Sequence, residues 1–239
     1  LDLNIINWLE QYLNNYKGSL LCISHDKKFL ENITNQVFWL DRGNLKVSPK
    51  GFKFFDEWSD RLLCDDPGPI SPYRVIHEMN TLFDKSSTVV THDAGNPRDQ
   101  IVPFYDAITP RGYPGWGKST HLGSSLGMAL GGKLAKPDWL SVNFIGDAGF
   151  GQTANDFETA VRSNLPILTV LVNNGVMGGY GAYMPDAVEK YQSSSLGGDY
   201  TAMAVAMGGH AERIEKASEV RAALERGIKK TQEGIPTLL

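Results

Sequence analysis

Two short apolar runs, 140–145 and 167–172, form the clearest pattern in the chain. Each run has the length of a buried strand, and each is followed by Gly or Asn, as strand ends often are. Thr153 between them is a suitable N-cap for a helix with acidic residues in its first turn, and Pro166 ends helical geometry near Asn164. The pattern therefore predicts a strand–helix–strand unit with a right-handed crossover and two parallel strands.

The same alternation of helices and strands extends over residues 73–239. Ser71 and Pro72 suit the N-cap and the first position of a helix. The other predicted elements are a strand at 87–91, helices at 126–134, 200–207 and 217–230, a short strand at 209–214 and a last strand from 235. This order predicts an α/β fold with a doubly wound, mainly parallel sheet that carries helices on both faces.

Residues 1–63 show a shorter and different pattern. The predicted elements are a helix at 4–15, a buried strand at 19–23, a helix from Phe29, a hairpin with strands at 37–40 and 45–47, and a helix at 51–63. Residues 64–72 are acidic and proline-rich, which is typical of a linker. We therefore expect a small partial α/β fragment at 1–63, a linker at 64–72 and a larger domain at 73–239.

Composition excludes several classes of function. The 239 residues are 41% hydrophobic with a net charge of −4, so the chain has the content of a globular protein and no basic field for nucleic acid. No apolar run approaches the ~20 residues that span a bilayer, so we expect no membrane partner. Cys22 and Cys64 are the only cysteines, and without a secretory signal they are expected to be free thiols. These features favour a cytoplasmic location.

Candidate chemistry lies at the ends of the two central strands. Asp147 follows the first strand in the sequence Gly146-Asp147-Ala148-Gly149-Phe150-Gly151, and Asn174 follows the second in Asn173-Asn174-Gly175. Parallel strands finish at the same edge of a sheet, so these two side chains can meet there. A carboxylate, an amide oxygen and backbone carbonyls suit Mg²⁺, and the glycines let backbone N–H groups approach a diphosphate.

This stretch resembles the cofactor motif of the thiamine-diphosphate enzymes, in which GDG is followed by a helix, a strand and NN. The resemblance implies Asp147, the Asn174 side chain and the Val176 carbonyl as ligands of Mg²⁺. It implies contacts with thiamine diphosphate at Gly146, Ala148, Gly149, Val176 and Met177. Ala148 departs from the motif's second Gly, which a negative φ would allow. The alternative is an ordinary strand–helix turn with an Asn-Asn-Gly loop.

Two further segments resemble this family: the loop after the strand at 87–91 resembles that of thiamine enzymes in general, and the segment 115–125, together with the cofactor motif, resembles the acetolactate synthase-like branch. After the strand at 87–91, the resemblance places Asp93 and Ala94 at the diphosphate edge. His92 faces the substrate in one interpretation and is a loop histidine without function in the other. In the segment 115–125, Leu122 aligns with the aliphatic residue that supports the bent cofactor, or is simply a core residue. The other candidates there, as donors or points of close approach to phosphate, are Gly117, Lys118, Ser119 and Thr120.

Residues 1–63 resemble the end of an ABC-type ATPase cassette of the ABC-F branch. Leu1-Asp2 is similar to the end of its D-loop, and Ile23-Ser-His-Asp26 to its switch strand, with His25 as the γ-phosphate sensor. The hairpin region with Leu40-Asp-Arg-Gly43 also matches. Residues 1–63 contain no GxxxxGK[ST] motif to hold nucleotide phosphates. We therefore expect no ATP hydrolysis, and we interpret His25 as vestigial.

The function implied by these resemblances is that of a thiamine-diphosphate- and Mg²⁺-binding domain of an acetolactate synthase-like enzyme. Such enzymes decarboxylate a 2-oxo acid and transfer its acyl group. In the family, a second domain holds the pyrimidine ring with a glutamate, so we expect a homo-oligomer or a partner with that domain, and no activity of this chain alone. No catalytic residue is assigned here. The alternatives are an ABC-F-type ATP-binding module and an inactive joined fragment, and whether the fusion is genuine stays open.

Overall fold

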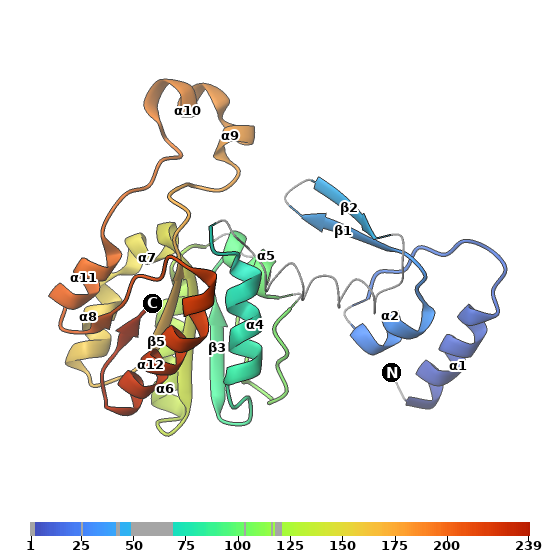
Figure 1. Ribbon diagram of the computed structural model, residues 1–239, viewed down its shortest axis with the longest axis horizontal. Helices are drawn as coiled ribbons and strands as arrows, with labels where there is room; N and C mark the ends of the chain where they lie inside the picture. The colour runs from blue at the N-terminus through green and yellow to red at the C-terminus, as the bar shows by residue number, and fades with distance from the viewer. Residues whose placement is uncertain are drawn as a thin grey trace. The chain divides into compact units, whose positions relative to one another are not determined.

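The computed structural model describes residues 3–24, 26–41, 44–48, 69–102, 104–115, 117 and 121–239. The chain divides into two compact units, Leu1–Asp65 and Asp66–Leu239 (Figure 1). His25, the predicted helix at 51–63 and most of the predicted linker 64–72 lie outside the described residues.

The first unit contains two helices and a hairpin. They are α1 (Leu3–Asn14), α2 (Lys27–Ile33), β1 (Val37–Asp41) and β2 (Asn44–Ser48), and the strands pair antiparallel. Asp26 caps α2 by accepting a hydrogen bond from Phe29 N at 3.0 Å. Asn32 Nδ2 donates to Glu10 at 3.0 Å and links the two helices. These helices and the hairpin agree with the prediction from the sequence.

The prediction of a buried strand at 19–23 is wrong. These residues form no strand, and Leu20, Leu21 and Ile23 are 55%, 78% and 91% exposed. A strand is stabilised by hydrogen bonds to a neighbouring strand and by an apolar face covered by other elements. The described part of this unit offers the segment neither, so its apolar side chains remain in solvent.

The second unit is built on a five-stranded sheet in which every neighbouring pair is parallel. In spatial order the strands are β3 (Thr88–His92), β4 (Leu140–Gly146), β5 (Leu168–Val172), β7 (Thr237–Leu238) and β6 (His210–Ala211). The central strand β4 is buried from Ser141 to Ile145. This sheet confirms the predicted parallel α/β fold.

Helices cover both faces of the sheet (Figure 1). On β4, Val142 and Phe144 point into one core, while Ile145 packs into the other, as the alternation of side chains along a strand requires. The first core is closed by α4 (Pro72–Leu82) and α12 (Val220–Gln232), and the second by α6 (Ser124–Ala135), α7 (Asp147–Thr153), α8 (Asn155–Arg162) and α11 (Tyr200–Ala206). The sheet is therefore doubly wound, with α5 (Asn96–Ile101) and the 3₁₀ turn η1 (Ala217–Glu219) completing the unit.

The crossover from β4 to β5 differs from the prediction in one respect. Thr153 is not an N-cap: it is the last residue of α7, which begins directly at Asp147, and Ala154 precedes α8. The glycine-rich stretch is therefore helical, although glycine disfavours helices. Phe150 explains this result, because its ring is fully buried, 5.9 Å from the Tyr200 ring and 6.1 Å from the Phe157 ring.

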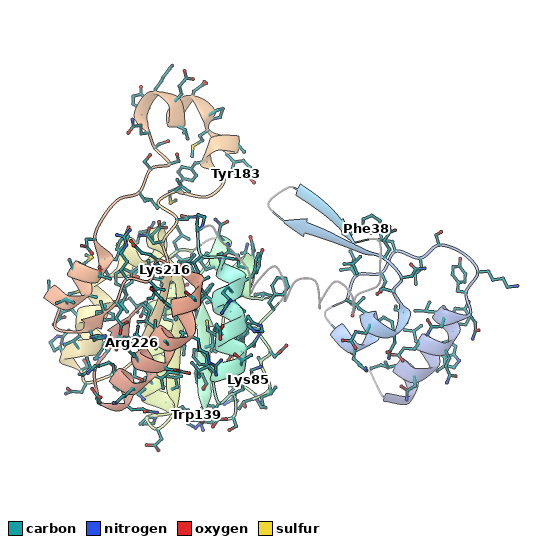
Figure 2. The ribbon with its side chains drawn as sticks, in the orientation of Figure 1. Phe38, Lys85, Trp139, Tyr183, Lys216 and Arg226 are labelled. Carbon is teal, nitrogen blue, oxygen red and sulfur yellow. The ribbon has the colours of Figure 1, made fainter. Side chains whose placement is uncertain are left out.

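Two short helices stand away from the sheet (Figure 1). They are α9 (Tyr180–Tyr183) and α10 (Pro185–Tyr191), and neither contains a buried residue. Tyr183, labelled in Figure 2, is 83% exposed, and Tyr191 is 78% exposed. Both helices are held by their own backbone hydrogen bonds, among them Met184 N to Tyr180 O at 2.8 Å and Gln192 N to Val188 O at 3.0 Å.

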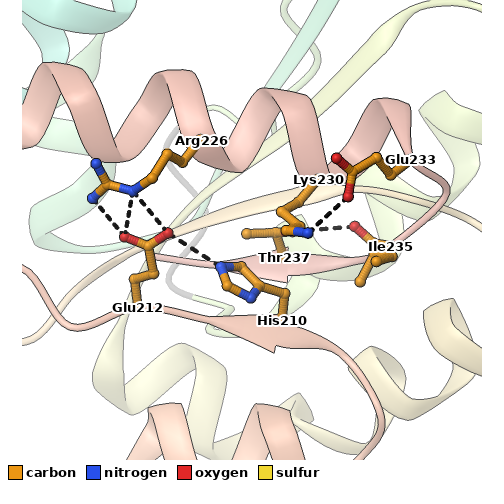
Figure 3. A network of polar contacts seen from close by, with 7 residues as sticks. All are labelled: His210, Glu212, Arg226, Lys230, Glu233, Ile235 and Thr237. Carbon is orange, nitrogen blue, oxygen red and sulfur yellow. Dashed lines mark hydrogen bonds and ion pairs between the residues drawn. The ribbon is translucent and has the colours of Figure 1, made fainter.

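The edge strand β6 is tied to α12 by an ion-pair network (Figure 3). Arg226 on α12 approaches Glu212 at 2.7 Å, and His210 Nε2 lies 3.2 Å from the same carboxylate. The hydrogen bonds from Arg226 lower the pKa of Glu212. Near the end of the helix, Lys230 pairs with Glu233 at 2.7 Å.

Candidate functional site

The predicted site residues gather where β3, β4 and β5 end. His92 pairs in register with Phe144, and Gly146 pairs with Val172. The chain continues from these strand ends into Asp93, Asp147 and Asn173. The carboxyl edge of the sheet thus collects the polar residues that the sequence singled out, as parallel α/β sheets generally do.

Asp147 is the central residue of this edge. Its side chain is only 3% exposed. Oδ1 accepts a hydrogen bond from Ala148 N at 2.8 Å, and Oδ2 accepts one from Gly175 N at 2.7 Å. Two backbone donors therefore fix the carboxylate at the start of α7, and each oxygen retains a lone pair for a further partner. Gly146, with φ of −88° and extended geometry, serves as the N-cap residue of α7.

The loop after β5 is held in a defined shape beside Asp147. Asn174 Oδ1 accepts a hydrogen bond from Val176 N at 3.1 Å, and Gly175 adopts a φ of +68° that favours glycine. Val176 bridges to Ser195, and Met177 N donates to Ser194 O at 2.7 Å. The side chains of Asn174 and Val176 are exposed. The loop is thus anchored at its base while its amide oxygen lies at the surface.

The Asp93 carboxylate binds the backbone at the start of α6, a role that the sequence did not predict. Its carboxylate is 1% exposed and accepts a hydrogen bond from Gly123 N, 2.9 Å from each oxygen, directly before α6. Ser125 N lies 3.5 Å from Oδ1. The carboxylate therefore satisfies N–H groups at the start of a helix that would otherwise lack partners. Ala94, the next residue, is also buried.

Gly149 connects the Asp93 and Asp147 regions. A Cβ on Gly149 would overlap Asp93 Oδ2. Only glycine therefore allows α7 to lie against the Asp93 carboxylate. Ala148, where the family motif has Gly, is half-buried and lies in ordinary helical geometry, so its methyl group causes no backbone strain.

The described residues of the segment before α6 lie against α5 and the end of β3. Gly117, with a φ of +59°, accepts a hydrogen bond from Arg98 through its carbonyl, at 3.4 Å. Leu122 is half-buried, and its Cδ2 lies 3.9 Å from the position that a Cβ of Gly95 would take. Lys118, Ser119 and Thr120 lie outside the described residues.

His92 is not a loop residue, contrary to one of its two interpretations: it is the last residue of β3 and is 6% exposed. Its ring lies 5.2 Å from that of Tyr113, which in turn stacks on Tyr105 at 5.5 Å. Burial lowers the pKa of His92 and raises the pKa of Tyr105 to about 12. Sequence reasoning missed this aromatic stack, because only the fold brings Tyr113 to the end of β3.

Within the described residues, no group of three or more His, Cys, Asp or Glu side chains is arranged to hold a metal ion. A cation at this edge would need a site with one carboxylate, completed by amide and carbonyl oxygens. The helices of the described part of the chain are too short or too polar to cross a membrane.

Comparison with known families identifies the second unit. The model of the C-terminal TPP-binding domain of thiamine pyrophosphate enzymes matches residues 93–239. The chain belongs to this family. Asp93, Asp147 and Asn174, which the fold gathers at one edge, all lie within the matched TPP-binding domain.

Individual relatives support the assignment and show a second similarity. The acetolactate synthase large subunit IlvG of Mycobacterium tuberculosis is 31% identical over 188 residues, which cover 74% of this chain and 32% of the relative. The 2-hydroxyacyl-CoA lyase of Oryza sativa subsp. japonica is 29% identical over 67% of this chain and 29% of the relative. The ATP-binding protein Uup of Buchnera aphidicola (strain Sg) is 44% identical over 55 residues, 23% of this chain and 9% of the relative. The chain spans about a third of the length of the acetolactate synthase relatives, and the short Uup similarity supports the resemblance to ABC-F proteins.

Proposed function

We propose that residues 73–239 bind thiamine diphosphate through Mg²⁺ at the carboxyl edge of the sheet, as a domain of an acetolactate synthase-like enzyme. The observation that carries this proposal is the buried Asp147 carboxylate, fixed by Ala148 N and Gly175 N within the TPP-binding domain. A carboxylate held by two backbone donors is pre-organised for a hard cation.

The donor set fits the metal and the diphosphate. Asp147 would contribute a carboxylate oxygen, Asn174 its amide oxygen and Val176 its backbone carbonyl. Oxygen ligands of this kind, few in number, suit Mg²⁺, which keeps water or phosphate oxygens in its remaining positions. Gly146, Ala148 and Gly149 at the start of α7 would bring backbone N–H groups towards the diphosphate. The Asp93 side chain already accepts a hydrogen bond from Gly123 N, so we assign it to holding Gly123 rather than to contact with phosphate.

The bound cofactor supplies the carbanion chemistry that decarboxylates a 2-oxo acid and carries its acyl group. In this chain, Asp147 and the 174–176 loop would orient the cofactor. Met177 and the segment 117–122, including Lys118, Ser119, Thr120 and Leu122, would surround it. Pyruvate-type 2-oxo acids are the proposed substrate class, and the pyrimidine end would need a second domain, from a homo-oligomer or another partner. Cleavage of a 2-hydroxyacyl-CoA is the second candidate reaction, because a lyase of that kind is also among the relatives.

Isothermal titration calorimetry of the purified chain with thiamine diphosphate tests this proposal. We expect saturable binding in the presence of Mg²⁺ and little binding when EDTA removes the cation. Thiamine without the diphosphate serves as the control ligand, because it lacks the group that the metal would hold. Absence of binding at millimolar thiamine diphosphate and Mg²⁺ would overturn the proposal.

The rival assignment, an ABC-F-type ATP-binding module, lacks the necessary chemistry. Residues 1–63 contain no GxxxxGK[ST] motif, whose backbone loop and lysine hold the phosphates in a nucleotide site of that class. The sequence matches this pattern at residues 112–119, which lie within the matched TPP-binding domain and not in the ABC-like segment. We therefore propose that the first unit contributes no ATP hydrolysis. We further propose that the chain joins parts of two different proteins, with 1–63 as the fragment, 64–72 as the linker and 73–239 as the domain.

A further inference from the structure

The described residues between Gly112 and Gly123, which include the candidate residues Gly117 and Leu122, are fastened to β3 and α5. Val90 N donates to Gly112 O at 2.9 Å, so the segment begins as an extension of the edge of β3. Arg98 on α5 donates to Gly117 O. The segment ends where Gly123 N donates to the Asp93 carboxylate. Its described parts are therefore tied to neighbouring elements at both ends.

His92 occupies the middle of this arrangement. Its ring packs against Tyr113, and a Cβ on Gly115 would overlap His92 Nε2. The backbone at Gly115 therefore passes directly over the imidazole, which only glycine permits. Tyr105 lies behind Tyr113, and Lys85 Nζ lies 5.8 Å from the Tyr105 ring centre. The imidazole is thus enclosed between an aromatic stack and the crossing backbone.

The other side of the imidazole contacts the backbone of Asp93. His92 Nδ1 lies 3.3 Å from Asp93 O, which suits an Nδ1–H donor to that carbonyl. The carboxylate of the same Asp93 holds Gly123. Two adjacent residues therefore hold the residues before α6: His92 contacts Tyr113 and Gly115, and Asp93 binds Gly123.

We infer that His92 is a positioning residue for thiamine diphosphate: its ring sets the positions of Tyr113 and Gly115 and, through the Asp93 peptide, that of Gly123, at the end of β3 where the diphosphate would bind. This inference rests on the proposed function. Buried as it is, His92 is assigned no contact with the reacting atoms. Its effect passes through Tyr113, Gly115 and the Asp93 peptide to the start of α6.

Amide hydrogen exchange on the full chain without cofactor tests whether His92 holds Gly123 in position. We expect His92→Ala and Tyr113→Ala to speed the exchange of the Gly123 amide at least tenfold, while amides within β4 exchange as in the wild type. Tyr113→Phe should behave as the wild type, because the Tyr113 hydroxyl has no hydrogen-bond partner among the described residues. His77→Ala, on α4, is the matched control.

Titration of the same variants with thiamine diphosphate and Mg²⁺ tests whether this positioning affects cofactor binding. The dissociation constant should rise at least tenfold in His92→Ala and stay within twofold of the wild type in Tyr113→Phe and His77→Ala. His92→Asn keeps an N–H donor near Asp93 O, so its effect on Gly123 exchange should be smaller than that of His92→Ala.

The outcomes separate this inference from the proposed function. Unchanged Gly123 exchange in His92→Ala overturns the inference, and so does faster exchange throughout the domain, which would make His92 an ordinary core residue. If the wild type binds the cofactor and His92→Ala binds it equally well, the positioning role is wrong and the proposed function stands. If the wild type binds no cofactor, the proposed function fails, and with it the assignment of His92 to cofactor positioning.

Discussion

The Gly175 backbone N–H donates a 2.7 Å hydrogen bond to Oδ2 of Asp147 and so joins the ends of β4 and β5. The loop that carries Asn174 is therefore shaped by the same carboxylate that we propose as the metal ligand. A change at Asp147 removes a proposed ligand and at the same time alters the loop that offers another. The substitution used to test the site must keep this hydrogen bond.

Asp147→Asn is the suitable change, because the amide oxygen can still accept from Gly175 while the negative charge is lost. We expect Mg²⁺-dependent binding of thiamine diphosphate to weaken at least about 100-fold, since the loss of a partner that merely orients a metal ligand already costs up to about that factor. Calorimetry measures the change. Asp156→Asn on α8 is the matched control, and equal affinities of the two variants would refute the assignment of Asp147.

Gly149→Ala tests the close approach of α7 to Asp93. The new Cβ would overlap Asp93 Oδ2, whose carboxylate is buried and engaged by Gly123. We expect a loss of about 1–3 kcal/mol in the free energy of unfolding, as for other overpacked interiors. Urea denaturation measures this loss. Gly127→Ala on α6 is the control: its Cβ meets nothing within 4 Å, and alanine favours a helix, so the stability should rise slightly.

The sequence was sufficient for the elements whose apolar pattern is local. The strands around 140–145 and 167–172 and the helix near 126–134 appear in the structure within a few residues of their predicted limits, and a helix begins at Pro72 as predicted. Polar residues after parallel strands also predicted the edge that holds Asp147 and the Asn174 loop, because all strand ends of such a sheet face one way.

The remaining features depend on contacts between distant parts of the chain. The Asp93–Gly123 hydrogen bond and the His92–Tyr113 contact form only when the folded chain brings Gly123 and Tyr113 to the end of β3. The helical start at Asp147 was missed because glycine signals a turn, whereas the burial of Phe150 decides for a helix. The strand predicted at 19–23 does not form, although its apolar residues and its length suit a strand, because no strand in the described part of the unit pairs with it.

The exposed apolar side chains of that segment lead to a third prediction. Leu21 and Ile23 are 78% and 91% exposed in a stretch that is neither helix nor strand, and neighbouring exposed apolar side chains favour association between chains. The double substitution Leu21→Ser, Ile23→Ser should reduce self-association, measured by analytical ultracentrifugation, and leave the thermal midpoint of the second unit unchanged. Lys17→Ser is a control that alters an exposed polar position. Persistent association of the double variant would assign the contact to another surface.

Protonation of His92 should make the second unit less stable in mild acid. Burial, the largest cause, lowers the pKa of His92 below its ordinary value of 6.5; Arg98 lowers it further, and the Asp93 carbonyl and the charges of Asp93 and Asp99 oppose this. The unfolded chain therefore binds this proton more readily than the folded chain, and stability falls as the pH drops from 6.5 towards the folded pKa. The thermal midpoint between pH 7 and pH 5 measures this effect.

His92→Asn is the reference for that measurement, because asparagine does not titrate. The wild type should lose more stability than this variant over the same interval. The hydrogen-bonded carboxylates of Asp84, Asp199 and Glu212 have lowered pKa values, so their stabilising effect is lost only at more acidic pH. Parallel curves for the two proteins would show that His92 does not titrate in this range.

The last prediction is that these 239 residues alone do not turn over a 2-oxo acid. The family resemblance places the pyrimidine end of the cofactor on a second domain whose glutamate assists deprotonation of the thiazolium carbon. The described residues form one five-stranded sheet and one hairpin, and neither candidate acid near the motif suits this task. Glu158 on α8 pairs with Arg162 at 3.2 Å, and Glu189 lies exposed on α10.

Without such an acid, general acid–base assistance worth about 10²–10⁴-fold in rate is missing. Purified chain with pyruvate, thiamine diphosphate and Mg²⁺ should therefore release CO₂ no faster than the free cofactor does. An intact 2-oxo acid decarboxylase run in parallel confirms that the assay detects the reaction. Release well above the background would show that a carboxylate of this chain reaches the cofactor, and Glu158→Gln and Glu189→Gln would then identify it. Binding without turnover is the combination expected of a domain that holds the diphosphate through Asp147 and leaves the proton transfer to a partner.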